Sequence, residues 1–115
     1  MLLVWYPKCT TCKRAEKFLK ERGAKFETRH IKDAKPSAEE LAEWIKTSGL
    51  SARKFFNTSG LLYKELGLKA KLDSMNEAEQ IALLASDGML VKRPLLVGEG
   101  FVKVGFKETD WEKVL

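Results

Sequence analysis

The sequence is poor in the residues from which metal sites are built. Its 115 residues include two cysteines, Cys9 and Cys12, and a single histidine, His30. A structural zinc site needs about four ligands, and His30 falls in an expected strand rather than beside a second cysteine pair. A lone histidine in a strand is more often exposed or hydrogen-bonded than catalytic. We therefore expect no metal site and assign His30 no chemical role.

Long hydrophobic runs are also missing. No window approaches the ~20 apolar residues of a membrane span. The opening MLLVWYPKC is too short for a signal peptide and has no positive charge before its apolar residues. We therefore expect a cytoplasmic protein without membrane contact. Structural disulfides are rare in the cytoplasm, and a close cysteine pair there is more often catalytic, redox-sensing or metal-binding.

Charge of one sign is not gathered anywhere in the chain. The net charge is +5, but Lys and Arg are interleaved with Glu and Asp, and no run resembles a basic tail. This pattern is typical of a solvated surface, so direct nucleic-acid binding is not expected. A hydrophobic fraction of 44% suits one globular domain over residues 1–115.

The first third of the chain has the pattern of a strand, a helix and a second strand. Leu2–Tyr6 is a continuous apolar run, typical of a strand buried on both faces. Thr10–Arg22 has apolar residues at helical spacing, and Lys25–Ile31 alternates as a strand does. Together they predict a βαβ unit over residues 1–34.

Residues 35–90 are predicted to form a helical insert without strands. Ser37 followed by Glu40 is a capping box at the start of one helix, and Asn76 opens another. The three helices of the insert are each expected to end at a glycine, namely Gly49, Gly67 and Gly88.

Residues 91–115 are predicted to form a ββα unit. Pro94–Val97 and Phe101–Val104 read as short strands joined by a GEG hairpin signal. KETDWEKVL is a last helix, with Thr109 as a candidate cap. Its inward-facing residues are expected to be Trp111, Val114 and Leu115. The whole chain is then an α/β domain, a mixed sheet flanked by helices with a helical insertion.

The two cysteines are expected where the first strand gives way to the first helix, in YPKCTTCKRAEKFL. Unpaired N–H groups at a helix start stabilise a thiolate, which is the nucleophilic form of cysteine. Cys12, one turn into the helix, can reach Cys9 to close a disulfide. This spacing predicts that Cys9 attacks and Cys12 resolves. Thr10 and Thr11 offer hydroxyl and N–H groups to a substrate, or serve only as caps.

Three alternatives remain for the cysteine pair: a zinc site, a structural disulfide and ordinary burial. A disulfide closing so small a ring adds little stability, and burial alone does not account for Cys9 at a strand-to-helix turn. CxxC beside a βαβ pattern favours redox work in a thioredoxin-like fold.

The sequence resembles the arsenate reductase family from end to end. The resemblance is carried by YPKCTTCKRAEKFL, YKELGL in the insert, VKRPLLV and the closing VKVGFKETDW. It implies a thioredoxin- or glutaredoxin-like fold, and a cis bond between Arg93 and Pro94 that faces the cysteine loop. It also implies that Arg93 and Pro94 belong to the substrate site.

The oxyanion site of that family is only partly present. The nucleophilic cysteine of the arsenate reductases matches Cys9, and one of their three oxyanion-binding arginines matches Arg93. The other two fall near Asn57 in KFFNTSG and near Gly105 in KVGFKE. A doubly charged oxyanion needs several charge-assisted donors, which arginine supplies best. Arsenate reduction is therefore not expected.

Two functions follow from the resemblance. The favoured one is a thiol–disulfide oxidoreductase that acts on a small-molecule or protein substrate, has no tightly bound cofactor and takes glutathione as a candidate co-substrate. Arg93 and the first-turn amides would bind the anionic part of that substrate. The alternative is an Spx-type redox-sensing regulator that binds the RNA polymerase α subunit. Spx chains normally continue with a basic segment past this motif, whereas this sequence ends at Leu115, which favours the reductase.

Overall fold

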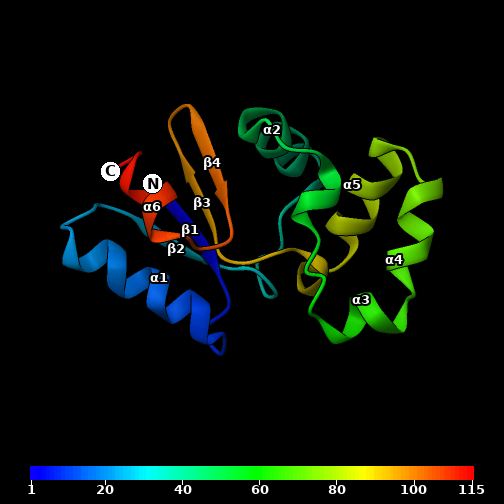
Figure 1. Cartoon of the computed structure of the whole chain (residues 1–115), viewed down its shortest axis with the longest axis horizontal. Coiled ribbons are helices and arrows are strands. Elements are labelled where there is room, and N and C mark those ends of the chain that lie inside the picture. The colour runs from blue at the N-terminus through cyan, green and yellow to red at the C-terminus, as the bar shows by residue number, and fades with distance from the viewer.

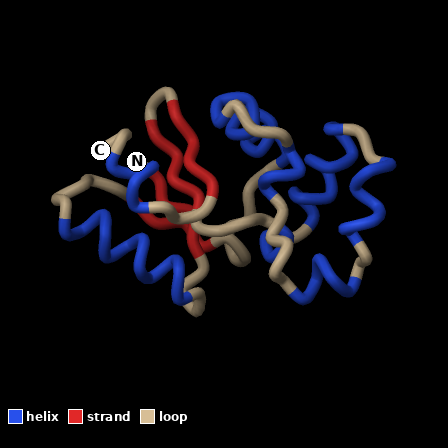
Figure 2. Tube along the Cα trace, in the orientation of Figure 1, coloured by secondary structure: helices blue, strands red, loops and turns tan.

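A mixed sheet of four strands lies at the centre of the computed structural model, which describes all residues from 1 to 115 (Figures 1 and 2). The strands are β1 (Leu2–Trp5), β2 (Glu27–His30), β3 (Leu95–Gly98) and β4 (Phe101–Val104). Their order across the sheet is β2-β1-β3-β4. β1 pairs in parallel with β2 and antiparallel with β3, and β3 pairs antiparallel with β4. The predicted mixed sheet is confirmed.

Helices cover both faces of this sheet. They are α1 (Thr10–Glu21), α2 (Ala38–Ser48), α3 (Leu61–Glu65), α4 (Leu68–Lys71), α5 (Glu77–Ser86) and α6 (Glu108–Glu112). Figure 1 shows α1 and α6 on one side of the sheet and α2 to α5 on the other. Along the chain, β1, α1 and β2 come first, α2 to α5 follow, and β3, β4 and α6 come last. No helix is long and apolar enough to cross a membrane.

The sheet separates two apolar cores. Alternate residues of a strand point to opposite faces, so Leu3 packs with Leu19 and Trp111 on the α1 side, while Val4 packs with the insert. The insert side is larger, with 16 buried residues against six. The larger of the two cores therefore lies between the sheet and the helical insert.

Local capping signals fix the ends of the two longest insert helices. Ser37 caps α2 and Asn76 caps α5, and each forms a complete capping box with the glutamate three residues later. Gly49 ends α2 at φ +73°, a conformation that glycine adopts without strain. These predictions are confirmed.

Three predicted details of the helix ends are wrong. α5 ends at Asp87 in extended backbone, so Gly88 is not its cap. A Cβ atom at Gly88 would lie 1.8 Å from the carbonyl oxygen of Ile31, so this glycine is required by close backbone approach. Lys107 rather than Thr109 precedes α6. Leu115 is exposed, because α6 ends at Glu112 and Leu115 lies beyond the helix.

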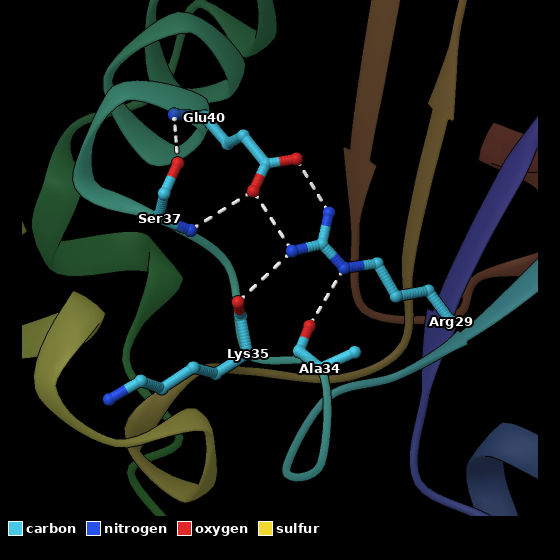
Figure 3. Close-up of polar contacts among 5 residues, drawn as sticks. All are labelled: Arg29, Ala34, Lys35, Ser37 and Glu40. Atoms are coloured by element: carbon cyan, nitrogen blue, oxygen red, sulfur yellow. Dashed lines mark hydrogen bonds and ion pairs between the residues drawn. The ribbon is translucent and has the colours of Figure 1, made fainter.

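A partly exposed ion pair joins the sheet to the insert (Figure 3). The guanidinium of Arg29, on β2, donates to both carboxylate oxygens of Glu40 on α2, at 2.5 and 2.9 Å. It also donates to the carbonyl oxygens of Ala34 and Lys35. The Arg29 hydrogen bonds, helped by the Ser37 amide, lower the pKa of Glu40 to about 2. One arginine thereby holds the chain that leads from β2 into α2.

Candidate active site

Cys9 stands at the turn between β1 and α1. It is the N-cap residue of α1, with extended backbone. Its amide donates to the carbonyl oxygen of Tyr6 at 2.9 Å, and its own carbonyl accepts from the amide of Lys13 at 3.1 Å. These two bonds fix the position of Cys9 at the helix start, as the sequence predicts.

The environment of Cys9 favours its thiolate. Partial burial raises the pKa of Cys9, but hydrogen bonds from the backbone and side chain of Cys12 and from Arg93, together with the charge of Arg93, outweigh this. The net pKa is below that of an ordinary thiol. No oxygen-bearing side chain caps the first turn of α1. The Cys12 amide therefore remains available to the sulfur, and Cys9 is an activated nucleophile.

The pKa of Cys12 is shifted in the opposite direction from that of Cys9. It is fully buried. Burial, and then the hydrogen bond and negative charge of the Cys9 thiolate, raise the pKa of Cys12 to about 12. Both residues are free thiols in this structure. At neutral pH the two thiols are therefore distinct, one activated and one protonated.

Arg93 reaches the cysteine loop from the far end of the insert. The Arg93–Pro94 peptide bond is cis, as the resemblance implies. The guanidinium lies 5.0 Å from the centre of the Tyr6 ring, and Nη1 lies 4.0 Å from the sulfur of Met89. Stacking on Tyr6 orients the guanidinium without neutralising it. Its charge remains available to the Cys9 sulfur.

A cavity of about 430 Å³ opens over Cys9. Its lining comes from four separate parts of the chain: the cysteine loop, the insert, the segment before β3, and the end of β4 with the loop that follows it. The lining residues are Cys9, Thr11, Asn57, Ser59, Gly60, Lys92, Arg93, Val104, Gly105, Phe106 and Lys107. Asn57 and Gly105, near which the resemblance would place the two missing arginines, therefore line the same cavity as Cys9.

Of the remaining predicted site residues, one lines the cavity and two do not. Thr11 lines the cavity, whereas Thr10 is exposed and does not. Pro94 is buried and does not line it either, but its carbonyl accepts the amide of Gly105 at 2.9 Å. Pro94 thereby positions the loop that carries Gly105.

Sequence reasoning did not single out Lys92, Phe106 or Lys107 as site residues. Lys92 precedes Arg93, and Phe106 and Lys107 follow Gly105. Their position next to predicted site residues was the signal that could have identified them. Trp111, read from the sequence as a packing residue, is fully buried and also donates its indole N–H to the carbonyl of Gly105 at 3.0 Å. Helix α6 therefore supports one wall of the cavity.

His30 is held in a structural contact. Its Nδ1 accepts hydrogen bonds from the amides of Lys32 and Asp33, at 3.2 and 3.1 Å, and its ring meets that of Tyr6 edge to face. The bystander role predicted for His30 agrees with these bonds. No group of three or more His, Cys, Asp or Glu side chains comes together in the chain.

Comparison with known proteins places this geometry in a family. The sequence model of the ArsC family matches residues 4–114. The crystal structure of an ArsC family related protein from Bacteroides fragilis is 55% identical and superposes with a TM-score of 0.97, over 99% of this chain and 96% of that one. A possible arsenate reductase from Streptococcus mutans is 44% identical, with a TM-score of 0.88 over 96% of each chain.

A regulator is also among the relatives. The global transcriptional regulator Spx of Listeria innocua is 24% identical over 109 residues, which cover 95% of this chain and 82% of the regulator. Similarity to both a reductase and a regulator means that resemblance alone does not choose between these functions.

Proposed function

The chain belongs to the ArsC family, and on that premise we propose that it is a thiol–disulfide oxidoreductase in which Cys9 attacks and Cys12 resolves. One observation carries this assignment: the surroundings of the pair lower the pKa of Cys9 and raise that of Cys12. A pair in which only one thiol is ionised has a defined order of attack.

The two cysteine thiols supply both electrons that reduce the substrate disulfide. The Cys9 thiolate attacks one sulfur of a disulfide, the S–S bond breaks, and the leaving thiolate takes a proton from solvent. Cys12 then loses its proton and attacks the Cys9 sulfur, which releases the second thiol and leaves a Cys9–Cys12 disulfide. Two electrons have moved from the pair to the substrate. A thiol such as glutathione, or a dithiol protein, reduces the pair again.

The first step prepares the second. Burial is the largest cause that raises the pKa of Cys12, but the hydrogen bond and charge of the Cys9 thiolate add to it. Once Cys9 is bound in a mixed disulfide, that negative charge no longer exists. Cys12 then ionises more readily, so its activation follows substrate attachment.

Arg93 has two roles in this proposal. Its charge stabilises the Cys9 thiolate, and its side chain, which lines the same cavity as Cys9, binds an anionic group of the substrate. Arsenate is not the proposed substrate, because Asn57 and Gly105 provide no positive charge where the arsenate reductases have arginines.

A reductase assay tests the proposal. Purified protein is given a panel of glutathione-mixed disulfides, and arsenate as a separate substrate, with glutathione or a dithiol protein as reductant. We expect turnover of the disulfides and negligible turnover of arsenate. Absence of disulfide turnover with every reductant would contradict the proposal.

The alternative proposal is a redox-sensing regulator of the Spx type, which the similarity to Spx supports. In that case the Cys9–Cys12 disulfide is a switch, and the partner is the RNA polymerase α subunit. A pull-down with the C-terminal domain of that subunit separates the proposals. Tight binding favours the regulator, and no binding in either redox state favours the enzyme.

A further inference from the structure

The space beside Gly105 is filled by a neighbouring lysine. Gly105 has φ +74°, and a Cβ atom there would lie 3.1 Å from Cε and 3.7 Å from Nζ of Lys92. The end of the Lys92 side chain therefore lies directly against the position where a side chain at residue 105 would begin. A cation is still present in this part of the cavity, although it comes from a different residue.

Both sides of this contact are held by the backbone. The amide of Lys92 donates to the carbonyl oxygen of Phe55 at 2.7 Å, and Phe55 is fully buried. Gly105 is held by its bond to Pro94 and by the indole of Trp111. The fold therefore fixes the two backbone segments that bring Lys92 and Gly105 together.

The cavity has an excess of positive charge. Lys92, Arg93 and Lys107 line it, and no Asp or Glu does. None of these three cations takes part in an ion pair of the chain. An anionic ligand would therefore meet several unneutralised cations around one thiolate.

We propose that Lys92 is a second anion-binding residue of the Cys9 cavity and that the substrate is a disulfide of a carboxylate-bearing thiol. This inference rests on the proposed function for its substrate and on the Lys92–Gly105 contact for its residue. A lysine ammonium is a mobile point charge, while arginine presents a planar fork. Lys92 is therefore suited to a carboxylate on a flexible thiol rather than to a tightly held oxyanion.

Alkylation of Cys9 tests the role of Lys92 without any turnover. The rates with anionic iodoacetate and neutral iodoacetamide are measured at low ionic strength, and their ratio is compared between variants. A change in thiolate population affects both rates equally, so the ratio reports the charge around the sulfur. Lys92→Met keeps most of the length of the side chain and removes its charge, and Lys92→Arg keeps the charge. As a control, Lys113→Met removes an exposed lysine that does not line the cavity.

We expect the iodoacetate-to-iodoacetamide ratio to fall by up to about fivefold in Lys92→Met, since an exposed charge contact is worth up to about 1 kcal/mol. It should stay near the wild-type value in Lys92→Arg and Lys113→Met, and high salt should reduce the difference. An unchanged ratio in Lys92→Met would overturn the role of Lys92.

Turnover of two matched disulfides tests the substrate class. With dithiothreitol as reductant, kcat/KM is measured for dithiodipropionate, which carries two carboxylates, and for neutral bis(hydroxyethyl) disulfide. We expect Lys92→Met to lower the ratio of the two values by a similar factor, mostly through KM. An unchanged ratio would overturn the carboxylate assignment. If the wild type reduces neither disulfide, the proposed function and the substrate class fail, while the alkylation ratio still decides whether Lys92 binds anions.

Discussion

The two sides of the sheet contribute different things to the Cys9 cavity. The α1 side supplies both cysteines from one strand-to-helix turn, where burial and the contacts between the two residues set their pKa values apart, with a further contribution from Arg93. The insert side supplies Asn57 and leads into Lys92 and Arg93. The two cysteines are therefore placed by local structure, whereas most of the other residues around the cavity come from segments far away in the sequence.

Replacing the cysteines should have the largest effect, and it tests the contribution of the α1 side alone. Cys9→Ser should lower disulfide reduction by about a thousandfold or more, because a serine hydroxyl is far less nucleophilic than a thiolate.

Under mild oxidant the wild type should form an intramolecular disulfide, whereas Cys12→Ser should accumulate mixed disulfides at Cys9. Non-reducing mass spectrometry measures both species. An oxidised wild type that is mainly a disulfide-linked dimer would contradict the resolving role of Cys12.

Arsenate turnover tests the contribution of the insert. Two missing charge-assisted contacts, at about 1.5–3 kcal/mol each, should weaken transition-state binding a hundredfold or more. Asn57→Arg, which adds a cation from the insert, should therefore raise arsenate turnover, with Asn57→Gln as the uncharged control. Robust arsenate reduction by the unmodified protein would show that another basic group fills this role.

The third arginine cannot be restored as simply. Gly105→Arg places a side chain on backbone with φ +74°, which costs about 1–2 kcal/mol. The new side chain would also press against Lys92. We therefore expect the double variant, Asn57→Arg with Gly105→Arg, to be less stable than Asn57→Arg alone. Thermal unfolding of the two variants measures this difference.

Arg93 links the two sides, so its replacement should have an intermediate effect. Removing the charge in Arg93→Met should raise the pKa of Cys9 and slow its alkylation several-fold in weakly acidic solution, because the hydrogen bond and charge of Arg93 help to lower that pKa. Arg93→Lys should retain part of the rate, because it keeps the charge without the planar fork. The pH profile of iodoacetamide labelling gives the pKa directly. A profile that is the same in Arg93→Met and in the wild type would mean that helix-start groups alone activate Cys9.

The Arg29–Glu40 pair should affect stability while leaving the chemistry intact. Its carboxylate is partly exposed, so we expect Glu40→Gln to destabilise the fold by only about 1 kcal/mol, or roughly 4 °C in Tm. The exposed neighbour provides a matched control in Glu39→Gln, which should change Tm by a few tenths of that. Labelling of Cys9 should be unchanged in both variants.

The pH dependence of the same pair has a defined sign. The folded pKa of Glu40, about 2, is below its unfolded value of about 4.3. The stability that it contributes is therefore complete above about pH 5 and is lost as the pH falls toward 2. Denaturant unfolding between these values should show a smaller loss in Glu40→Gln than in the wild type.

Local signals in the sequence predicted local structure well. The capping boxes at Ser37 and Asn76 are present because each needs only residues within one helical turn. Gly88 was misread because its requirement comes from the Ile31 carbonyl, more than fifty positions earlier in the chain. A glycine that ends a helix and one that permits close approach look alike in sequence.

The candidate site divides in the same way. Cys9 and Cys12 could be placed from their spacing and from the strand and helix around them. The contact of Lys92 with Gly105, and the joint of Arg29 with Glu40, connect segments that only the folded chain brings together. No local pattern marks such pairs, so sequence alone did not reveal them.

The order of alkylation of the two cysteines tests the central claim most directly. The protein is treated with a limiting amount of iodoacetamide between about pH 6 and 7, and the sites are quantified by mass spectrometry of its peptides. Cys9, with its lowered pKa, should be labelled well before the buried Cys12. Faster labelling of Cys12 would contradict the assignment of Cys9 as the attacking thiolate.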